Sequence, residues 1–291
     1  MKNTSYAKKS VIGNKNIELW VRAHPVASFF ILAYTISWIL WAPAALGYLG
    51  DTANVLVYIG VFGPAAAAML VTWILGDSIK FWFKGLFHWR VSPIWYAYAL
   101  GLPVLLIIIV TLEFLILGQK IELYLLKDRL IAYFPTLIFL SLLGGGNEEP
   151  GWRGFALPNL LKNRNPIPAT LILGVLWALW HIPLLAAMTD LSHGLGGVLL
   201  VIVLIATLLG IVAYAFTYTY LYNRTKSVLL CILLHGSFNT ANGLLILRSE
   251  TVGVTYAILQ ISMTLTLWII VGIIIIYTKG SLGIGVEEIK D

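Results

Sequence analysis

The chain has 291 residues, of which 59% are hydrophobic and only 11% are charged. Because a soluble domain carries roughly 25% charged residues, this composition excludes an ordinary soluble protein and indicates an integral membrane protein. The net charge of +6 does not indicate nucleic-acid binding, since basic residues in short loops orient membrane helices and attract anionic lipid.

Eight apolar segments are long enough to cross a bilayer, for which a helix needs about 20 residues. They are continuous rather than alternating, so they predict an all-α fold, a polytopic membrane bundle of about eight transmembrane helices, and not a β-barrel. The segments are 26–49, 53–76, 93–117, 130–146, 167–188, 195–222, 228–247 and 254–277. The fourth is the shortest and runs into three glycines, Gly144, Gly145 and Gly146.

The basic residues predict the orientation of the bundle. If the N-terminus is cytoplasmic, 15 of the 19 lysines and arginines face the cytoplasm, and only Lys120, Lys127, Arg129 and Arg248 lie outside. Cytoplasmic loops of membrane proteins carry such an excess of positive charge. We therefore expect both termini in the cytoplasm, with residues 1–25 as a basic cytoplasmic N-terminal segment.

Residues 79–90 (IKFWFKGLFHWR) differ from the spanning segments. Lys80, Lys84 and His88 recur every four residues. The large apolar side chains on the opposite side are Ile79, Trp82, Phe83, Leu86 and Trp89. This pattern predicts an amphipathic helix on the cytoplasmic surface of the membrane.

The first group of polar residues is the stretch GGGNEEPGWRG after the fourth segment. Asn147 before two acids and a proline is typical of a helix start, so one interpretation is a capped helix at the membrane boundary. Glu149 and Arg153 are four residues apart and can pair on one helix face. That pairing would leave Glu148 as a second carboxylate in an apolar pocket, where desolvation suits it to act as a general base.

Two further segments place polar side chains in apolar helices. His181 follows Trp177 by one turn in LWALWHIP, while His235 and Asn239 share one face of LLHGSFN because they are four residues apart. Taken alone, His181 is better explained as a hydrogen bond between packed helices, and the same explanation is open for His235 with Asn239. Cys231 and His235 also have the spacing of a nucleophilic pair, but cysteine in an apolar helix usually packs as a small hydrophobe.

Taken together, the three sites converge. On the predicted topology Glu148 lies at the cytoplasmic end of the fourth segment, and His181 lies near the midplane. His235 lies about eight residues, on the order of 12 Å, into the seventh segment from the same side. Because ionisable groups are costly in a membrane, this convergence predicts a functional cavity in the cytoplasmic half. Two histidines, two carboxylates and an amide can form a centre that activates water for hydrolysis.

These motifs resemble those of the CPBP family of intramembrane endopeptidases, which includes the type II CAAX prenyl endopeptidases. EEPGWRG matches the family's EExxxR motif, and HGSFN matches its HxxxN motif. LWALWHIP matches its aromatic-xxx-His motif, with Trp177 where phenylalanine is common. The resemblance spans roughly residues 130–245, which we expect to be the core motif region of a single integral membrane protease domain, 1–291.

The resemblance implies hydrolysis of a peptide bond inside the membrane. It implies a general base, Glu148, with His181 orienting the attacking water, and an oxyanion site made of His235 and Asn239. The residues with implied supporting roles are Glu149, Arg153 and Trp177.

The implied substrate is a prenylated CAAX protein or another membrane-associated peptide, and the implied partner surface is the lipid bilayer. Members of the prenyl-processing branch remove the last three residues after a lipidated cysteine. The implied location is the cell membrane in a prokaryote or the endoplasmic reticulum membrane in a eukaryote, with the site facing the cytoplasm.

Zinc is the alternative to this metal-free mechanism. Two histidines and a carboxylate also form a thermolysin-like zinc set, with Glu148, His181 and His235 as ligands and Glu149 as a possible base. Because the HExxH signature is absent, we expect no cofactor and keep zinc as the alternative.

Two alternatives come from other functional classes. A proton-coupled transporter uses intramembrane Glu and His as proton relays, but it also predicts inverted repeats, and none is visible in the sequence. A non-catalytic immunity scaffold would tolerate Glu148→Gln, whereas the endopeptidase would not.

Overall fold

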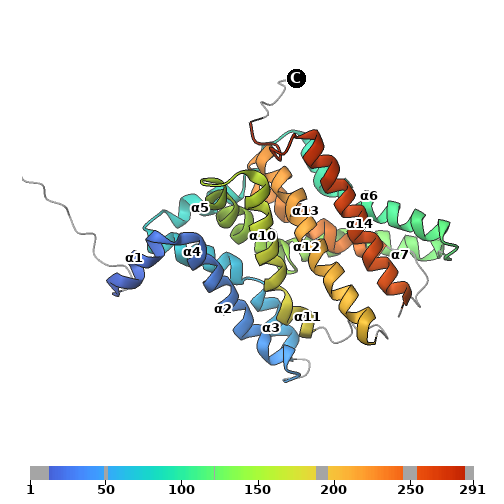
Figure 1. Ribbon diagram of the computed structural model, residues 1–291, viewed down its shortest axis with the longest axis horizontal. Coiled ribbons are helices and arrows are strands. Elements are labelled where there is room, and N and C mark those ends of the chain that lie inside the picture. Colours follow the sequence, from blue (N-terminus) through green and yellow to red (C-terminus); the bar gives the residue numbers. More distant parts are fainter. Residues whose placement is uncertain (1–12, 49–51, 121, 188–195, 245–253, 286–291) are drawn as a thin grey trace, which may run out of the picture.

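The computed structural model describes residues 13–48, 52–120, 122–187, 196–244 and 254–285. Every regular element in these residues is helical (Figure 1). The N-terminal half contains α1 (Lys15–Ala23), α2 (Pro25–Ala45), α3 (Thr52–Gly60), α4 (Gly63–Leu75), α5 (Ile79–Leu86), α6 (Pro93–Ile116), η1 (Leu123–Leu125) and α7 (Leu126–Leu143). The C-terminal half contains η2 (Gly146–Glu148), α8 (Glu149–Gly151), the π-helix η3 (Trp152–Ala156), α9 (Leu157–Leu161), α10 (Pro166–Trp180), α11 (Ile182–Ala187), α12 (Gly197–Thr225), α13 (Val228–Ala241), η5 (Asn242–Leu244) and α14 (Val254–Tyr277).

The predicted all-α membrane bundle is confirmed. Seven helical stretches among the described residues are long and apolar enough to cross a membrane: Pro25–Ala45, Val55–Leu75, Pro93–Ile116, Leu126–Leu161, Pro166–Ala186, Gly197–Thr225 and Val254–Tyr277. The protein is therefore a multi-pass membrane protein. The remaining predicted segment, 228–247, contributes a shorter apolar helix over Val228–Leu244, so the described residues confirm seven of the eight predicted spans. Residues 245–247 of that segment lie outside the described residues.

Three of the predicted spans are interrupted helices. The second divides into α3 and α4 before Pro64, which occupies the first turn of α4. The fifth divides into α10 and α11 at His181, because Pro183 has no N–H with which to continue the hydrogen-bond ladder. The fourth breaks after Leu143, turns at Gly145 (φ 130°), and resumes through η2, α8, η3 and α9. These interruptions place irregular backbone inside the bundle, where the polar motifs lie.

Helices α10, α12 and α13 occupy the middle of the bundle, with α1 to α5 on one side and α6, α7 and α14 on the other (Figure 1). The short α13 packs against α6, α7 and α12, while α12 packs along α10 and α14. The largest fully buried side chains include Trp41, Trp152, Trp180, Arg153 and Tyr218. Arg153 is a charged residue buried among these aromatic rings, so this part of the core has polar interactions in addition to apolar packing.

The predicted amphipathic helix forms as α5, although it ends at Leu86 instead of continuing to residue 90, and its place on the cytoplasmic surface stays a prediction. Ser78 caps it by accepting a hydrogen bond from the Phe81 N–H at 3.2 Å. The predicted apolar side is only partly correct, because Leu86 is buried whereas Phe83 and Trp89 are 53% and 60% exposed. Exposed aromatic side chains on a basic amphipathic helix are typical of the membrane–water interface.

Part of the basic N-terminal segment folds as α1, for which the patterns above predict no helix. Its signal is Asn14, whose side chain accepts hydrogen bonds from the N–H groups of Asn16 and Ile17. Near its end, Arg22 donates to the carbonyl oxygens of Leu75 (2.7 Å) and of the residue before it, at the C-terminus of α4. This contact docks α1 on the bundle. The lysines at positions 2, 8 and 9 lie outside the described residues.

Candidate active site

The polar residues of the three motifs come from separate parts of the chain. Glu148 and Glu149 lie at the junction of η2 and α8, His181 directly follows α10, and His235 and Asn239 lie on α13. Helix α13 packs directly against η2 and α8, which brings the first and third motifs together. The break at the three glycines allows this approach, because α7 ends where the acidic motif must turn back toward α13.

Glu148 is a buried carboxylate held by two indole groups. Its Oε2 atom accepts a hydrogen bond from Nε1 of Trp152 at 2.9 Å and from Nε1 of Trp177 at 2.7 Å. Glu148 is only 3% exposed. Its other oxygen, Oε1, accepts no hydrogen bond from the described residues. Hydrogen bonds to a carboxylate are stronger than bonds between neutral groups, so the indoles fix its orientation without pairing it with a cation.

Trp177 connects the three motifs. Its ring lies 5.8 Å from the His181 ring and 5.6 Å from the His235 ring, measured between centroids. Its indole N–H also reaches Glu148. Trp177, the aromatic residue of the second motif, therefore contacts Glu148 of the first motif and His235 of the third.

Glu149 binds two partners at once. Arg153 Nη1 lies 2.9 Å from each of its carboxylate oxygens, which confirms the predicted pairing of these two residues. Nδ1 of His235 lies 2.8 Å from Oε1 of Glu149. Because an ionised carboxylate only accepts, His235 donates through Nδ1, and the other ring nitrogen, Nε2, is left for chemistry.

The Arg153 guanidinium is stacked between two aromatic rings. Its Cζ atom lies 4.6 Å from the centroid of the Trp177 ring and 4.3 Å from that of Tyr218. Its Nε and Nη2 atoms have no hydrogen-bond partner among the described residues, so ring contacts replace water around this buried cation. Removing one partner of such a buried ion pair typically costs about 3–5 kcal/mol of stability.

The glycine turn lies directly against the third motif. A Cβ atom on Gly145 would be 2.6 Å from Nε2 of His235 and 2.6 Å from Nδ2 of Asn239, closer than any real contact. Asn239 Nδ2 donates to the carbonyl oxygen of Gly144 at 2.8 Å. The backbone of this turn and the side chains of α13 therefore form one wall of the site.

Asn147 does not cap a helix with its side chain, so this prediction is wrong. Its Oδ1 accepts a hydrogen bond from the backbone N–H of Gly145 at 3.0 Å, two residues earlier in the chain. The residue preceding α8 is Glu148, whose side chain makes no capping bond. The positive φ of Gly145 turns its N–H back toward Asn147, and the asparagine stabilises the glycine turn instead.

His181 stands at the end of α10, where the chain turns into α11. Its Nδ1 lies 2.8 Å from the carbonyl oxygen of Trp177, and its ring packs edge-on against Trp180 with centroids 4.9 Å apart. A ring nitrogen next to a carbonyl oxygen must carry the proton, so the neutral side chain presents Nε2 as an acceptor.

Metal binding finds little support in the arrangement of donors. Among the described residues, no three His, Cys, Asp or Glu side chains are grouped so that they could hold a metal ion. The hydrogen bonds themselves do not decide the question, because they leave Oε1 of Glu148 and Nε2 of each site histidine available, and a metal-binding histidine usually has its other ring nitrogen bonded to protein. The Cys231 sulfur lies 4.0 Å from the Tyr218 carbonyl oxygen, so it has a backbone partner of its own.

Two residues of the site are missing from the sequence prediction. Trp152 is four residues after Glu148, so helical spacing could have indicated its contact. Tyr218 lies in the apolar segment TYTYLY of α12, and nothing in that pattern distinguishes it from its neighbours. Only the packing of α12 against α10 and α13 identifies it.

Comparison with known proteins matches the part of the chain that carries these residues. Residues 130–241 match the family model described as Type II CAAX prenyl endopeptidase Rce1-like. The CAAX prenyl protease 2 of Methanococcus maripaludis is 30% identical over 155 residues, covering 50% of this chain and 51% of that relative. The chain thus spans about half the length of the curated relative it matches. All three motifs lie inside the matched region, which confirms the resemblance predicted from them.

Proposed function

We propose that this chain, an Rce1-like protein of the CPBP family, is an intramembrane endopeptidase that cleaves a prenylated, CAAX-type substrate near its C-terminus. The observation that carries the proposal is the buried carboxylate of Glu148. It accepts a hydrogen bond from the Trp177 indole, and the same indole packs against the rings of His181 and His235. The family match supports peptide hydrolysis over transport or scaffolding as the use of this cluster.

Glu148 acts as the general base in this proposal. Its Oε1 atom takes a proton from a water molecule, and the resulting hydroxide attacks the carbonyl carbon of the scissile peptide bond. His181 accepts a hydrogen bond from the same water through Nε2, because its Nδ1 is held by the Trp177 carbonyl oxygen. General acid–base catalysis by a positioned side chain contributes typically 10²–10⁴-fold in rate.

His235 and Asn239 stabilise the oxyanion of the tetrahedral intermediate. His235 already donates through Nδ1 to Glu149, so donation through Nε2 uses the imidazolium form in this proposal. Losing one oxyanion donor typically costs about 10²–10³ in kcat.

Collapse of the intermediate completes the reaction. The C–N bond breaks, and Glu148 returns its proton to the leaving amine. The products are a shortened chain ending in a carboxylate and a released peptide. Glu149 and Arg153 take no part in proton transfer and instead hold His235 in position.

The membrane setting suits a lipidated substrate. A prenyl chain partitions into the bilayer, so it delivers the adjacent peptide bond to a cavity that opens within the membrane. In the predicted orientation, with both termini in the cytoplasm, that cavity would open on the side where the substrate protein is found. The proposed mechanism is metal-free, and the chelator experiment below decides between it and the zinc alternative.

Cleavage of a fluorogenic farnesylated CAAX peptide by the purified protein tests this proposal. We expect wild type to cleave it and Glu148→Gln to lose activity by about 10²-fold or more, as expected for a lost general base. The matched control is Glu113→Gln. Glu113 is also an intramembrane carboxylate, but it accepts hydrogen bonds from Ser262 and Thr266 of α14, away from the site.

Three outcomes would count against the proposal. Undiminished cleavage by Glu148→Gln would reject this residue as the base, and equal loss in both variants would indicate a general effect on folding. Loss of wild-type activity after treatment with a strong chelator, restored by zinc, would replace the glutamate mechanism with the metal one. A farnesylated peptide left intact by wild type would reject the substrate class.

A further inference from the structure

The indole of Trp82 links the amphipathic helix α5 to the candidate active site. Trp82 packs against the hydrophobic core, whereas its neighbours Phe81 and Phe83 are 79% and 53% exposed. Its Nε1 atom donates a hydrogen bond to the carbonyl oxygen of Gly154 in η3 at 3.2 Å. Gly154 directly follows Arg153, so a residue outside the three motifs is bonded to the backbone that carries the first one.

The turn that carries Arg153 is a π-helix, and Pro158 provides the physical reason. A proline has no N–H, and its ring clashes with the carbonyl oxygen four residues earlier, which here is that of Gly154. The chain forms a wider turn instead, in which the N–H of Leu157 donates to the carbonyl oxygen of Trp152, five residues earlier. The Gly154 carbonyl therefore lacks its α-helical donor, and the Trp82 indole supplies a donor in its place.

The absence of a side chain at Gly154 allows α5 to approach. A Cβ atom on this residue would lie 3.0 Å from Cδ2 of Leu86 and 3.6 Å from Nε1 of Trp82. Leu86 is only 5% exposed, so its side chain is buried in this contact. Two side chains of α5, one turn apart, therefore lie directly on the π-helix.

The π-helix sets the direction of two side chains that bind the glutamates. Trp152 donates to Glu148 at 2.9 Å, and Arg153 donates to Glu149 at the same distance. Loss of the wide turn would rotate the residues on its two sides relative to each other by about 100°, the angle between successive residues of an α-helix. Because Trp152 and Arg153 both lie inside this turn, both hydrogen bonds depend on its geometry.

We propose that Trp82 is a positioning residue of the candidate active site, which holds the π-helix in place and thereby keeps Trp152 and Arg153 on the two glutamates. This inference rests on the proposed endopeptidase function. Trp82 itself takes no part in the chemistry, because its N–H is bonded to the Gly154 carbonyl oxygen and to none of the proposed reacting groups.

Kinetic constants for the farnesylated peptide test this role. Trp82→Phe keeps an aromatic ring and removes the donor, so kcat should fall about three- to tenfold, as expected for a lost hydrogen bond between neutral groups. KM should stay within about twofold of wild type, because Trp82 does not contact the substrate in this proposal. If Trp82 acts through Trp152, the two changes are not additive, and Trp82→Phe should lower kcat by less than about twofold in the Trp152→Phe background.

Pro158→Ala provides a measurement that does not need turnover. It gives residue 158 an N–H, which can donate to the Gly154 carbonyl oxygen in place of the indole. Trp82→Phe should lower the thermal unfolding midpoint by about 2 °C in the otherwise wild-type chain, and by less than half as much in the Pro158→Ala background. Loss of packing alone would lower the midpoint equally in both backgrounds.

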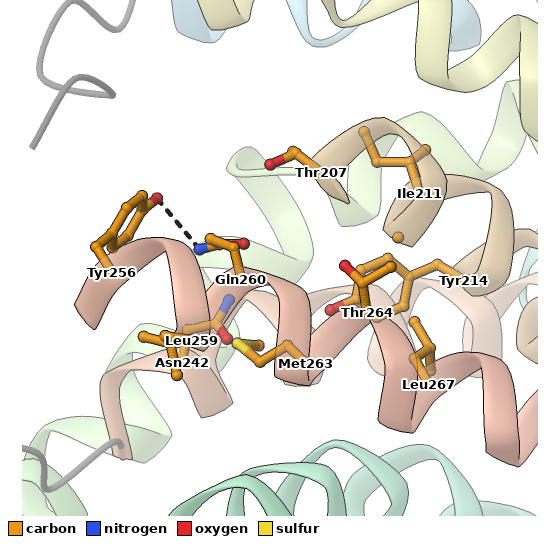
Figure 2. A pocket seen from close by; sticks show the side chains of 11 residues that line it. Thr207, Ile211, Tyr214, Asn242, Tyr256, Leu259, Gln260, Met263, Thr264 and Leu267 are labelled. Atoms are coloured by element: carbon orange, nitrogen blue, oxygen red, sulfur yellow. Dashed lines mark hydrogen bonds between the residues drawn. The ribbon is translucent and has the colours of Figure 1, made fainter. Parts of the chain in front are cut away.

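Trp268→Phe is the matched control. The Nε1 atom of Trp268 donates to the Leu209 carbonyl oxygen at 3.2 Å, so the same kind of bond joins α14 to α12. The neighbouring residues Leu267 and Gly210 line a cavity of about 330 Å³ between these two helices, and no motif residue is part of its lining (Figure 2). Trp268→Phe should therefore leave kcat near wild type.

The outcomes separate this inference from the proposed function. Additive effects of Trp82→Phe and Trp152→Phe on kcat, or an equal loss in midpoint with and without Pro158→Ala, would overturn the positioning role and leave the endopeptidase intact. If wild type cleaves no farnesylated peptide, the proposed function fails, and the Pro158→Ala comparison alone decides whether Trp82 holds the π-helix.

Discussion

Substitution of Gly145 by alanine tests whether the glycine turn shapes the oxyanion site. The new Cβ would lie 2.6 Å from both Nε2 of His235 and Nδ2 of Asn239. Ordinary van der Waals contact begins at 3.4 Å, so each donor must move by about 0.8 Å, against the hydrogen bonds that hold His235 to Glu149 and Asn239 to Gly144. Since one lost oxyanion donor costs about 10²–10³ in kcat, displacement of both should lower kcat by at least about 10²-fold.

The assay is turnover of the farnesylated peptide, with kcat and KM determined separately and the thermal unfolding midpoint measured on the same preparation. Alanine at Gly145 also incurs backbone strain, because its φ of 130° is disfavoured for residues with a Cβ. Gly118→Ala is the matched control, since Gly118 has a φ of 76° and nothing within 4 Å of the added Cβ. It introduces a Cβ at a positive φ without the contact, in a backbone conformation that alanine adopts more easily than that of Gly145, so strain at Gly145 is judged from the unfolding midpoint.

The expected result is a large fall in kcat for Gly145→Ala, with a smaller change in the unfolding midpoint, and near wild-type kcat for Gly118→Ala. A Gly145→Ala variant that unfolds at the wild-type temperature and retains more than about a tenth of wild-type kcat would refute the reasoning, since a single lost donor already costs more. It would mean that His235 and Asn239 do not act from the positions described here.

Three further predictions follow from the same contacts. Trp152→Phe removes one indole donor from Glu148 but keeps the ring, so kcat should fall about tenfold to a hundredfold, measured in the peptide assay. Arg153→Met leaves Glu149 buried without its cation and should destabilise the fold by about 3–5 kcal/mol in a denaturation measurement, whereas an exposed arginine changed to methionine should have little effect. Gly151→Ala would place a Cβ 2.5 Å from the backbone of α4, so its unfolding midpoint should fall, and an unchanged midpoint would show that these helices can separate freely.

The accuracy of the predictions made from the sequence differs between the motifs. Helical spacing sufficed for the pairing of Glu149 with Arg153, because residues four apart must meet on one helix face. The helix-start signals at Asn147 gave a wrong answer, because its side chain bonds to the turn at Gly145 instead of capping a helix. Local patterns therefore succeeded where regular helix continues and failed where the backbone leaves it.

The sequence by itself determined that the chain is an all-α membrane protein. A long continuous apolar segment lies in lipid, and there a helix is the structure that satisfies its backbone hydrogen bonds within the segment. It also determined which polar residues are too costly to be incidental, and their motifs carried the family resemblance. Tertiary structure alone decided that Trp177 contacts Glu148 and His235 of the other two motifs, that Tyr218 stacks on Arg153, and that a cavity lies between α12 and α14. These features depend on contacts between helices far apart in the chain, and the periodicity of one segment contains no information about which neighbour its faces will meet.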